Sequence, residues 1–200
     1  MKKIVVVGSF GFGKDKPSGQ RVKSQNVYYL LKEMSNAISY IEMIGIWKRP
    51  WLLLKMVFDI LISDVVFCMP AHRNLVTVFP LLCCVARIRK IPVHYVVVGG
   101  WLADYIQNRK RIQTLLKSIA GIHCQTEELS NNLRARYGFE NSDVFPNFRI
   151  TNYVSTSHHT PGVLKLVFIA RINKKKGLDT IFYIGDRPCE LEIYLKFKRK

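Results

Sequence analysis

Two cations that could hold phosphate oxygens follow an apolar run near the C-terminal end of the sequence. The run Leu164–Ile169 is typical of a buried strand, and Arg171 and Lys176 come after it, five residues apart, before the Gly-Leu-Asp at 177–179. Arg offers a planar fork of donors and Lys a point charge, and both suit an anionic oxygen. Taken alone, the run Lys174–Lys176 is more often a solvated surface loop.

A glycine-rich segment near the N-terminal end could also meet phosphate. Residues 8–14, GSFGFGK, match the spacing G-x-x-x-x-G-K of a phosphate-binding loop. That loop needs Ser or Thr next, to ligate magnesium, whereas Asp15 follows here and Pro17 postpones the helix. The dinucleotide pattern G-x-G-x-x-G also fails, because Lys16 stands where its third glycine belongs. An ATPase and an NAD enzyme are therefore both disfavoured.

What remains in this segment is a glycine-containing turn between a strand and a helix. The strand is Ile4–Val7, and apolar residues at helical spacing predict a helix over 20–33. Backbone amides at such a helix N-terminus can bind an anion, and Gly19 is the best placed residue for this. The competing interpretation is that Gly19 only allows the loop to turn and binds nothing.

Metal ligands are not grouped in the sequence. The five histidines are scattered and the five cysteines contain no C-x-x-C pair. The adjacent His158-His159 has no carboxylate or thiol neighbour in the sequence. We therefore expect no metal and no other cofactor, and a reduced, cytoplasmic protein.

The elements that would position these residues alternate along the chain. Strands are expected at 4–7, 38–46, 64–69, 93–98, 121–125 and 144–146, and helices at 20–33, 51–61, 74–88, 109–119 and 127–137. In the helix 51–61, Lys55 and Asp59 are expected on the solvent side. Gly99-Gly100 ends the clearest central strand, Val93–Val98. Alternation of this kind predicts an α/β fold with a Rossmann-like, doubly wound parallel sheet.

The domain boundaries follow from a change in composition. Residues 151–163 are polar, lack apolar periodicity and contain Pro-Gly, so they are expected to link a domain at 1–150 to a second unit at 164–200. That unit has a strand, a short helix from Gly177 and an alternating strand at 191–197. These elements cannot cover both faces of a parallel sheet, so we expect an incomplete second Rossmann-like domain.

The segment from Leu166 to Asp179 resembles the retaining family 4 glycosyltransferases. In that family, which has the GT-B fold, a strand ending in Gly-Arg or Ala-Arg and then Lys-Gly-Leu/Val-Asp opens the donor-binding domain. Pro17-Ser18-Gly19 is similar to the family's N-terminal loop. His123–Glu127 and Phe145–Arg149 resemble the segment that closes its first domain.

The resemblance implies a role for each matching residue. Arg171, Lys176 and Gly19 would bind the diphosphate of a nucleotide-sugar donor, without a metal. Gly99, Gly100 and Asn147 would lie at the acceptor side or the hinge. The catalytic residue stays unassigned, and the family's Glu-x7-Glu motif is not found in the sequence. The implied function is transfer of a hexosyl residue to a growing cell-surface glycan or lipid-linked acceptor, with little activity expected of so short a second domain.

The charge of +17 at pH 7 selects anionic partners. A non-catalytic basic module that binds RNA or an anionic membrane is the alternative function. RNA binding is disfavoured because most aromatic residues lie in apolar runs expected to be buried. Residues 47–54, WKRPWLLL, suit a helix at the inner membrane face, and a core helix with a basic end explains them equally well.

Overall fold

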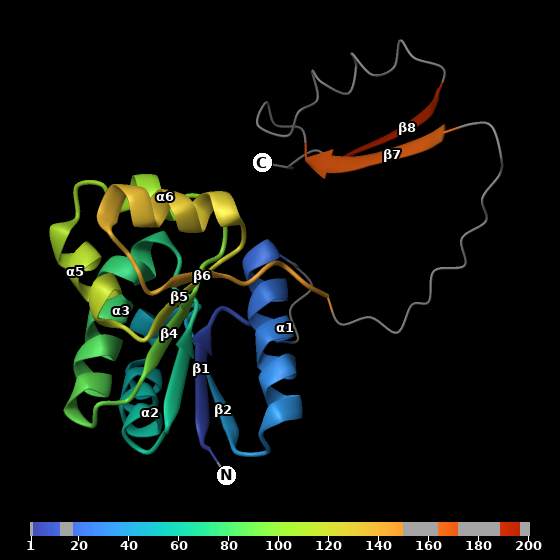
Figure 1. The fold of residues 1–200 in the computed structure, drawn as a ribbon. Helices are drawn as coiled ribbons and strands as arrows, with labels where there is room; N and C mark the ends of the chain where they lie inside the picture. Colours follow the sequence, from blue (N-terminus) through green and yellow to red (C-terminus); the bar gives the residue numbers. More distant parts are fainter. Residues whose placement is uncertain (1, 13–17, 150–163, 172–188, 197–200) are drawn as a thin grey trace. The chain divides into compact units, whose positions relative to one another are not determined.

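A computed structural model describes residues 2–12, 18–149, 164–171 and 189–196. The chain divides into two compact units, Met1–Thr151 and Asn152–Lys200, which are described separately (Figure 1). The expected linker 151–163, the helix from Gly177 and Lys176 lie outside the described residues.

The first unit is built on one sheet of six parallel strands in the order β2-β1-β3-β4-β5-β6. The strands are β1 (Ile4–Gly8), β2 (Ile38–Glu42), β3 (Val65–Cys68), β4 (Val93–Val96), β5 (Gly121–Cys124) and β6 (Ser142–Val144). Because all strands are parallel, their carboxyl ends meet at one edge of the sheet. The predicted α/β, Rossmann-like parallel sheet is confirmed.

Helices connect successive strands. They are α1 (Gly19–Met34), the 3₁₀ helix η1 (Ile46–Lys48), α2 (Pro50–Leu61), α3 (His72–Ile88), α4 (Leu102–Tyr105), α5 (Lys110–Ser118) and α6 (Glu127–Tyr137). The sequence did not predict η1 or α4, because both are too short to show a helical period. Among the described helices, none combines the length and the apolarity needed to cross a bilayer.

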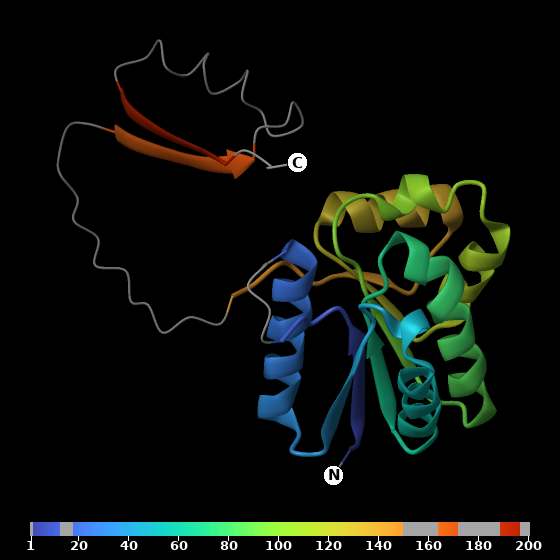
Figure 2. The same ribbon diagram turned by 180° about the vertical axis from the view of Figure 1, so that it is seen from behind.

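Two hydrophobic clusters show that both sheet faces are covered. The chain passes through α1 from β1 to β2, which lies at the edge of the sheet. It then passes through α2 from β2 to β3, on the other side of β1. Because the two connections run in opposite directions across the sheet and both are right-handed, α1 and α2 lie on opposite faces. Figures 1 and 2 show α1 apart from α2 and α3. Along β1, Val5 and Val7 enter one cluster and Ile4 and Val6 enter the other. This period of two is the expected pattern of a strand buried on both sides.

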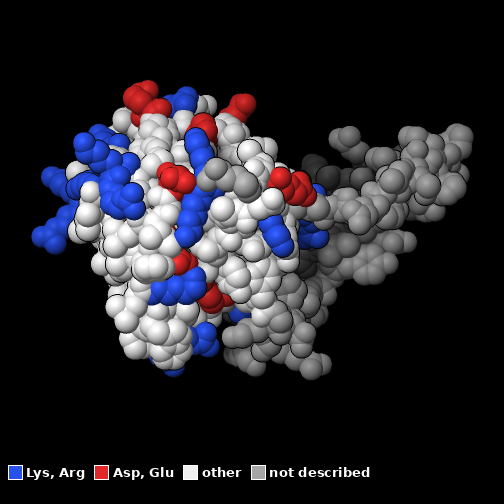
Figure 3. All heavy atoms as spheres, turned by 90° about the horizontal axis from the view of Figure 1, so that it is seen from below, with Lys and Arg blue, Asp and Glu red and all other residues white. Residues whose placement is uncertain are grey.

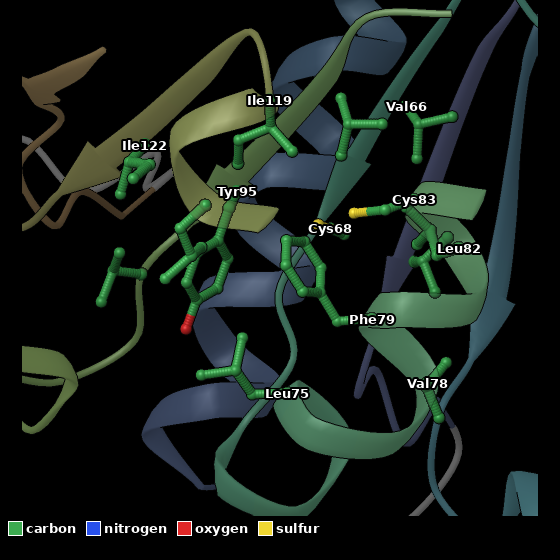
Figure 4. Close-up of a cluster of buried hydrophobic side chains, with 14 of the residues drawn as sticks. Val66, Cys68, Leu75, Val78, Phe79, Leu82, Cys83, Tyr95, Ile119 and Ile122 are labelled. Carbon is green, nitrogen blue, oxygen red and sulfur yellow. The ribbon is translucent and has the colours of Figure 1, made fainter. Parts of the chain in front are cut away.

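The larger cluster packs α3 against the middle of the sheet (Figure 4). The Tyr95 ring of β4 lies 5.8 Å from the Phe79 ring, and both side chains are fully buried. The Tyr95 hydroxyl donates to the carbonyl of Pro70 at 3.2 Å, so the one polar atom of this ring has a partner. Four cysteines are free thiols: Cys68, Cys83 and Cys124 are buried, and Cys84 is exposed.

One expectation about exposure is wrong, and another has exceptions. Asp59 does not lie on the solvent side of α2; it is buried and paired with Lys55, because α2 turns a different face toward the sheet than its charges suggest. The expectation that most aromatic residues are buried has exceptions, because aromatic side chains on α1, β2, η1 and α2 face solvent. The exposed aromatic residues are Tyr29, Tyr40, Trp47, Trp51 and Phe58.

The second unit contains a parallel pair of strands. β7 (Leu164–Arg171) pairs with β8 (Cys189–Lys196), with Leu164 opposite Cys189 and Arg171 opposite Lys196. Arg171 is thus the last residue of its strand.

Candidate functional site

A cavity of about 680 Å³ opens in the first unit at the carboxyl edge of the sheet. Its wall combines the N-terminal half of α1 with the segments that follow β4, β5 and β6. Among the predicted site residues, Gly19, Gly99 and Asn147 line it. In parallel α/β sheets, ligands bind in a crevice outside this edge, so the cavity is the candidate site.

The N-terminus of α1 contributes one wall of the cavity. Ser18 caps the helix, since its Oγ accepts a hydrogen bond from the Arg21 amide at 3.3 Å. Gly19 is exposed, and a Cβ added there would have no neighbour within 4 Å. No acidic side chain stands in the first turn of α1, so this end of the helix can face an anion without competition from its own carboxylates.

Lys23 contributes a buried cation one turn further along α1. Its side chain is buried, and its Nζ donates to the carbonyl oxygen of Val97 at 3.1 Å. Burial lowers the pKa of Lys23 to about 8, and the opposing influence of the Cys124 thiol is smaller. An anion placed in the cavity would favour the charged form of this ammonium, and the attraction between the two charges would strengthen binding of the anion.

Amide side chains form the floor beside Lys23. Gln125 Nε2 donates to the same Val97 carbonyl at 3.3 Å, and Gln125 Oε1 accepts from Asn147 Nδ2 at 3.3 Å. Asn26 Nδ2 donates to the Phe148 carbonyl at 2.7 Å, which joins α1 to the segment after β6. These amides are neutral donors and acceptors of the kind that bind sugar hydroxyls.

The two glycines after β4 differ in structure. Gly99 has φ +92°, and a Cβ added there would lie 2.9 Å from Cδ1 of Trp101. The Trp101 Nε1 donates to the Val98 carbonyl at 2.6 Å, which holds the ring in that place. Gly100 is exposed, has open space where a Cβ would stand and does not line the cavity.

Two backbone amides of the glycine-rich loop after β1 are occupied by a side chain of this chain. The Glu42 carboxylate accepts from the amides of Phe10 at 3.2 Å and Gly11 at 2.6 Å. A carboxylate here takes the donors that a nucleotide-binding phosphate loop would offer to its ligand. This adds a structural reason to the sequence argument against an ATPase.

The predicted diphosphate-binding pair cannot be assembled from the described residues. Arg171 ends β7 in the second unit, Lys176 lies outside the described residues, and Gly19 belongs to the first unit. Their shared role stays a prediction.

Sequence reasoning missed Lys23, Asn26 and Gln125. Lys23 stands four residues before Val27, on the apolar side of the helix, and a cation at such a position was the available signal. Gln125 lies within the segment His123–Glu127 that the resemblance singled out, but neither Gln125 nor Asn26 was expected in a site, because an amide in a polar segment is usually a surface residue.

A separate row of polar side chains crosses the sheet. His94 Nδ1 lies 3.0 Å from His123 Nε2, and His123 Nδ1 lies 2.6 Å from Asp143 Oδ1. His123 is therefore hydrogen-bonded to His94 on one side and to the Asp143 carboxylate on the other. Within the described ranges, no group of three His, Cys, Asp or Glu side chains is arranged to hold a metal ion.

No family model matches the chain, and no curated protein matches it. Eleven chains of solved structures match, among them MurG of Acinetobacter baumannii, with 13% sequence identity and a TM-score of 0.39. That match covers 97% of this chain and 66% of the MurG chain, just under two thirds of its length. The fold assignment therefore rests on the parallel sheet itself.

Proposed function

We propose that the chain belongs to a retaining, family 4-like glycosyltransferase that moves a hexosyl residue from a nucleotide sugar to a growing glycan. The observation that carries the proposal is the cavity in which the N-terminus of α1, the buried Lys23 and the residues after β4 and β6 meet. The Arg171–Asp179 motif supports it from the sequence side.

The proposed transfer reaction requires cations beside the diphosphate of the donor. Breaking the bond between the sugar and the nucleotide diphosphate leaves negative charge on the diphosphate, and without a metal that charge needs fixed cations. Arg171 and Lys176 take this role in the proposal, and Gly19 offers its amide to the same group. Gly99 and Asn147 contact the acceptor, a polyhydroxyl glycan or a lipid-linked sugar.

Lys23 is added to this assignment on structural grounds. Its ammonium is buried at the cavity wall, and a bound phosphate or sugar oxygen can replace or join the Val97 carbonyl as its acceptor. A charge-assisted hydrogen bond at a buried site is worth about 1.5–3 kcal/mol, or roughly a tenfold to hundredfold change in affinity.

The test is calorimetric titration of the 200-residue chain with a panel of UDP- and GDP-sugars. Binding is expected for one donor and not for AMP. The Lys23→Met variant should bind at least about tenfold more weakly, while Lys32→Met, an exposed lysine on the same helix, should bind like the wild type. Failure of every nucleotide sugar to bind, or equal binding by both variants, would contradict the proposal.

A further inference from the structure

An apolar stripe on η1 and α2 faces solvent. Within α2 its members recur every three or four residues, which places Trp51, Leu54 and Phe58 on one side of the helix, while Trp47 lies on η1 and Ile62 directly follows α2. They are Trp47, Trp51, Leu54, Phe58 and Ile62, here called the α2 stripe. Leu54 is 72% exposed, Phe58 62% and Trp51 61%, so the largest apolar groups of α2 are among its most exposed.

The residues of the α2 stripe do not pack the hydrophobic core. The opposite side of α2 places Met56 and Ile60 in the larger hydrophobic cluster, where both are fully buried. An amphipathic helix normally turns polar residues outward once its inner face is packed. A row of large exposed apolar groups on the outer face marks an interaction surface.

The charges beside the stripe are cationic. Lys48 and Arg49 are exposed between the two tryptophans. The one carboxylate from 44 to 63 is Asp59, which is buried and already paired with Lys55. No described carboxylate of η1 or α2 therefore offsets the exposed cations at this surface.

The end of the neighbouring helix α3 also combines an exposed apolar side chain with cationic ones. It packs beside α2, and Arg89 Nη1 donates to the Leu61 carbonyl at the end of α2. Ile88 is 71% exposed and stands between Arg87 and Arg89. Figure 3 shows Lys and Arg side chains, in blue, spread over one face of the described surface among Asp and Glu side chains, in red.

We propose that the α2 stripe docks the protein on the surface of a bilayer that contains anionic lipids. The apolar side chains enter the boundary between headgroups and acyl chains, the two tryptophans suit that boundary, and Lys48 and Arg49 meet lipid phosphates. A second copy of the chain docked through the same face would bring like charges together, which disfavours a symmetric dimer here. The inference does not depend on nucleotide-sugar binding.

The test uses the 200-residue chain and sedimentation with vesicles of phosphatidylcholine alone or mixed with phosphatidylglycerol. Binding is expected to the mixed vesicles, with a blue shift of tryptophan emission. Added salt should weaken this binding without abolishing it. The Leu54→Ser/Phe58→Ser variant should lose at least about tenfold in vesicle affinity.

A matched control separates the stripe from general surface apolarity. Tyr29→Ser/Met34→Ser removes two exposed apolar groups from α1 and should bind vesicles like the wild type. Both variants should keep the far-ultraviolet circular dichroism of the wild type, because all four side chains are exposed. No binding of the wild type to anionic vesicles, equal loss in both variants, or salt-sensitive binding of RNA in place of vesicles would overturn the inference.

Discussion

The Nζ atom of Lys23 lies 3.1 Å from the carbonyl oxygen of Val97, inside the wall of the cavity. The Gln125 amide donates to the same oxygen, so this carbonyl keeps a partner when the lysine is removed. The ammonium, by contrast, exchanges water for one neutral acceptor, and that exchange is what lowers its pKa.

Lys23→Met should stabilise the unliganded protein at neutral pH. The pKa of Lys23 falls from 10.5 in the unfolded chain to about 8 in the fold, so its charge costs stability below about pH 8. As pH rises from about 8 to 10.5 the unfolded chain holds more protons and this cost disappears. Because the cavity admits water, we expect a gain of about 1–2 kcal/mol at neutral pH rather than the value of the full shift.

Urea unfolding of wild type and Lys23→Met, at about pH 7 and about pH 10, measures this effect. The difference between the two proteins should shrink at the higher pH. A variant that is less stable than the wild type at neutral pH would show that the Val97 contact outweighs the burial of charge.

Gly99→Ala should destabilise the protein and Gly100→Ala should not. Alanine at Gly99 must adopt a positive φ and would press its Cβ against the Trp101 ring, which costs about 1–2 kcal/mol. Gly100 has neither restriction, so a change within about 0.5 kcal/mol is expected. Thermal unfolding checks both, and equal midpoints for the two variants would contradict the role assigned to the turn.

His94 should stay neutral to a lower pH than a free histidine. Burial and the neighbouring His123 lower its pKa, and Asp143 opposes them less strongly. The unfolded chain therefore takes up a proton first as the pH falls below about 6.5, and stability falls with it. NMR titration of the His94 ring should show the lowered pKa, and a ring that titrates above 6.5 would refute the prediction.

His94→Gln provides the thermodynamic counterpart. It removes this titration while keeping a polar group beside His123. The loss of stability between about pH 7.5 and 5 should be smaller in the variant than in the wild type.

Ser18→Ala should destabilise α1 by about 1 kcal/mol, because it removes the hydroxyl that accepts from the Arg21 amide. Ser18→Asp retains an acceptor at the cap and should restore most of the stability. Urea unfolding measures both, and an alanine variant as stable as the wild type would contradict the capping role.

Local pattern was enough to determine the order and kind of the long elements. The strand at Val93 and the helices at 74–88 and 127–137 show apolar spacing within single segments, and the fold class follows from their alternation. The same pattern placed Gly19 at the start of a helix and Gly99 at the end of a strand, and Asn147 came from the family resemblance. Their meeting in one cavity follows because parallel strands share a carboxyl edge.

Tertiary structure alone decided which polar residues are buried. Asp59 and Lys23 are charged residues that sequence rules place at the surface, yet both are buried because of partners and packing set by the whole fold. Conversely, the many apolar residues of α2 suggested a buried helix, but only one side of α2 packs against the sheet and its other side faces solvent. A sequence shows the period of a helix, but which side of the helix faces the core depends on neighbours that are distant in the chain.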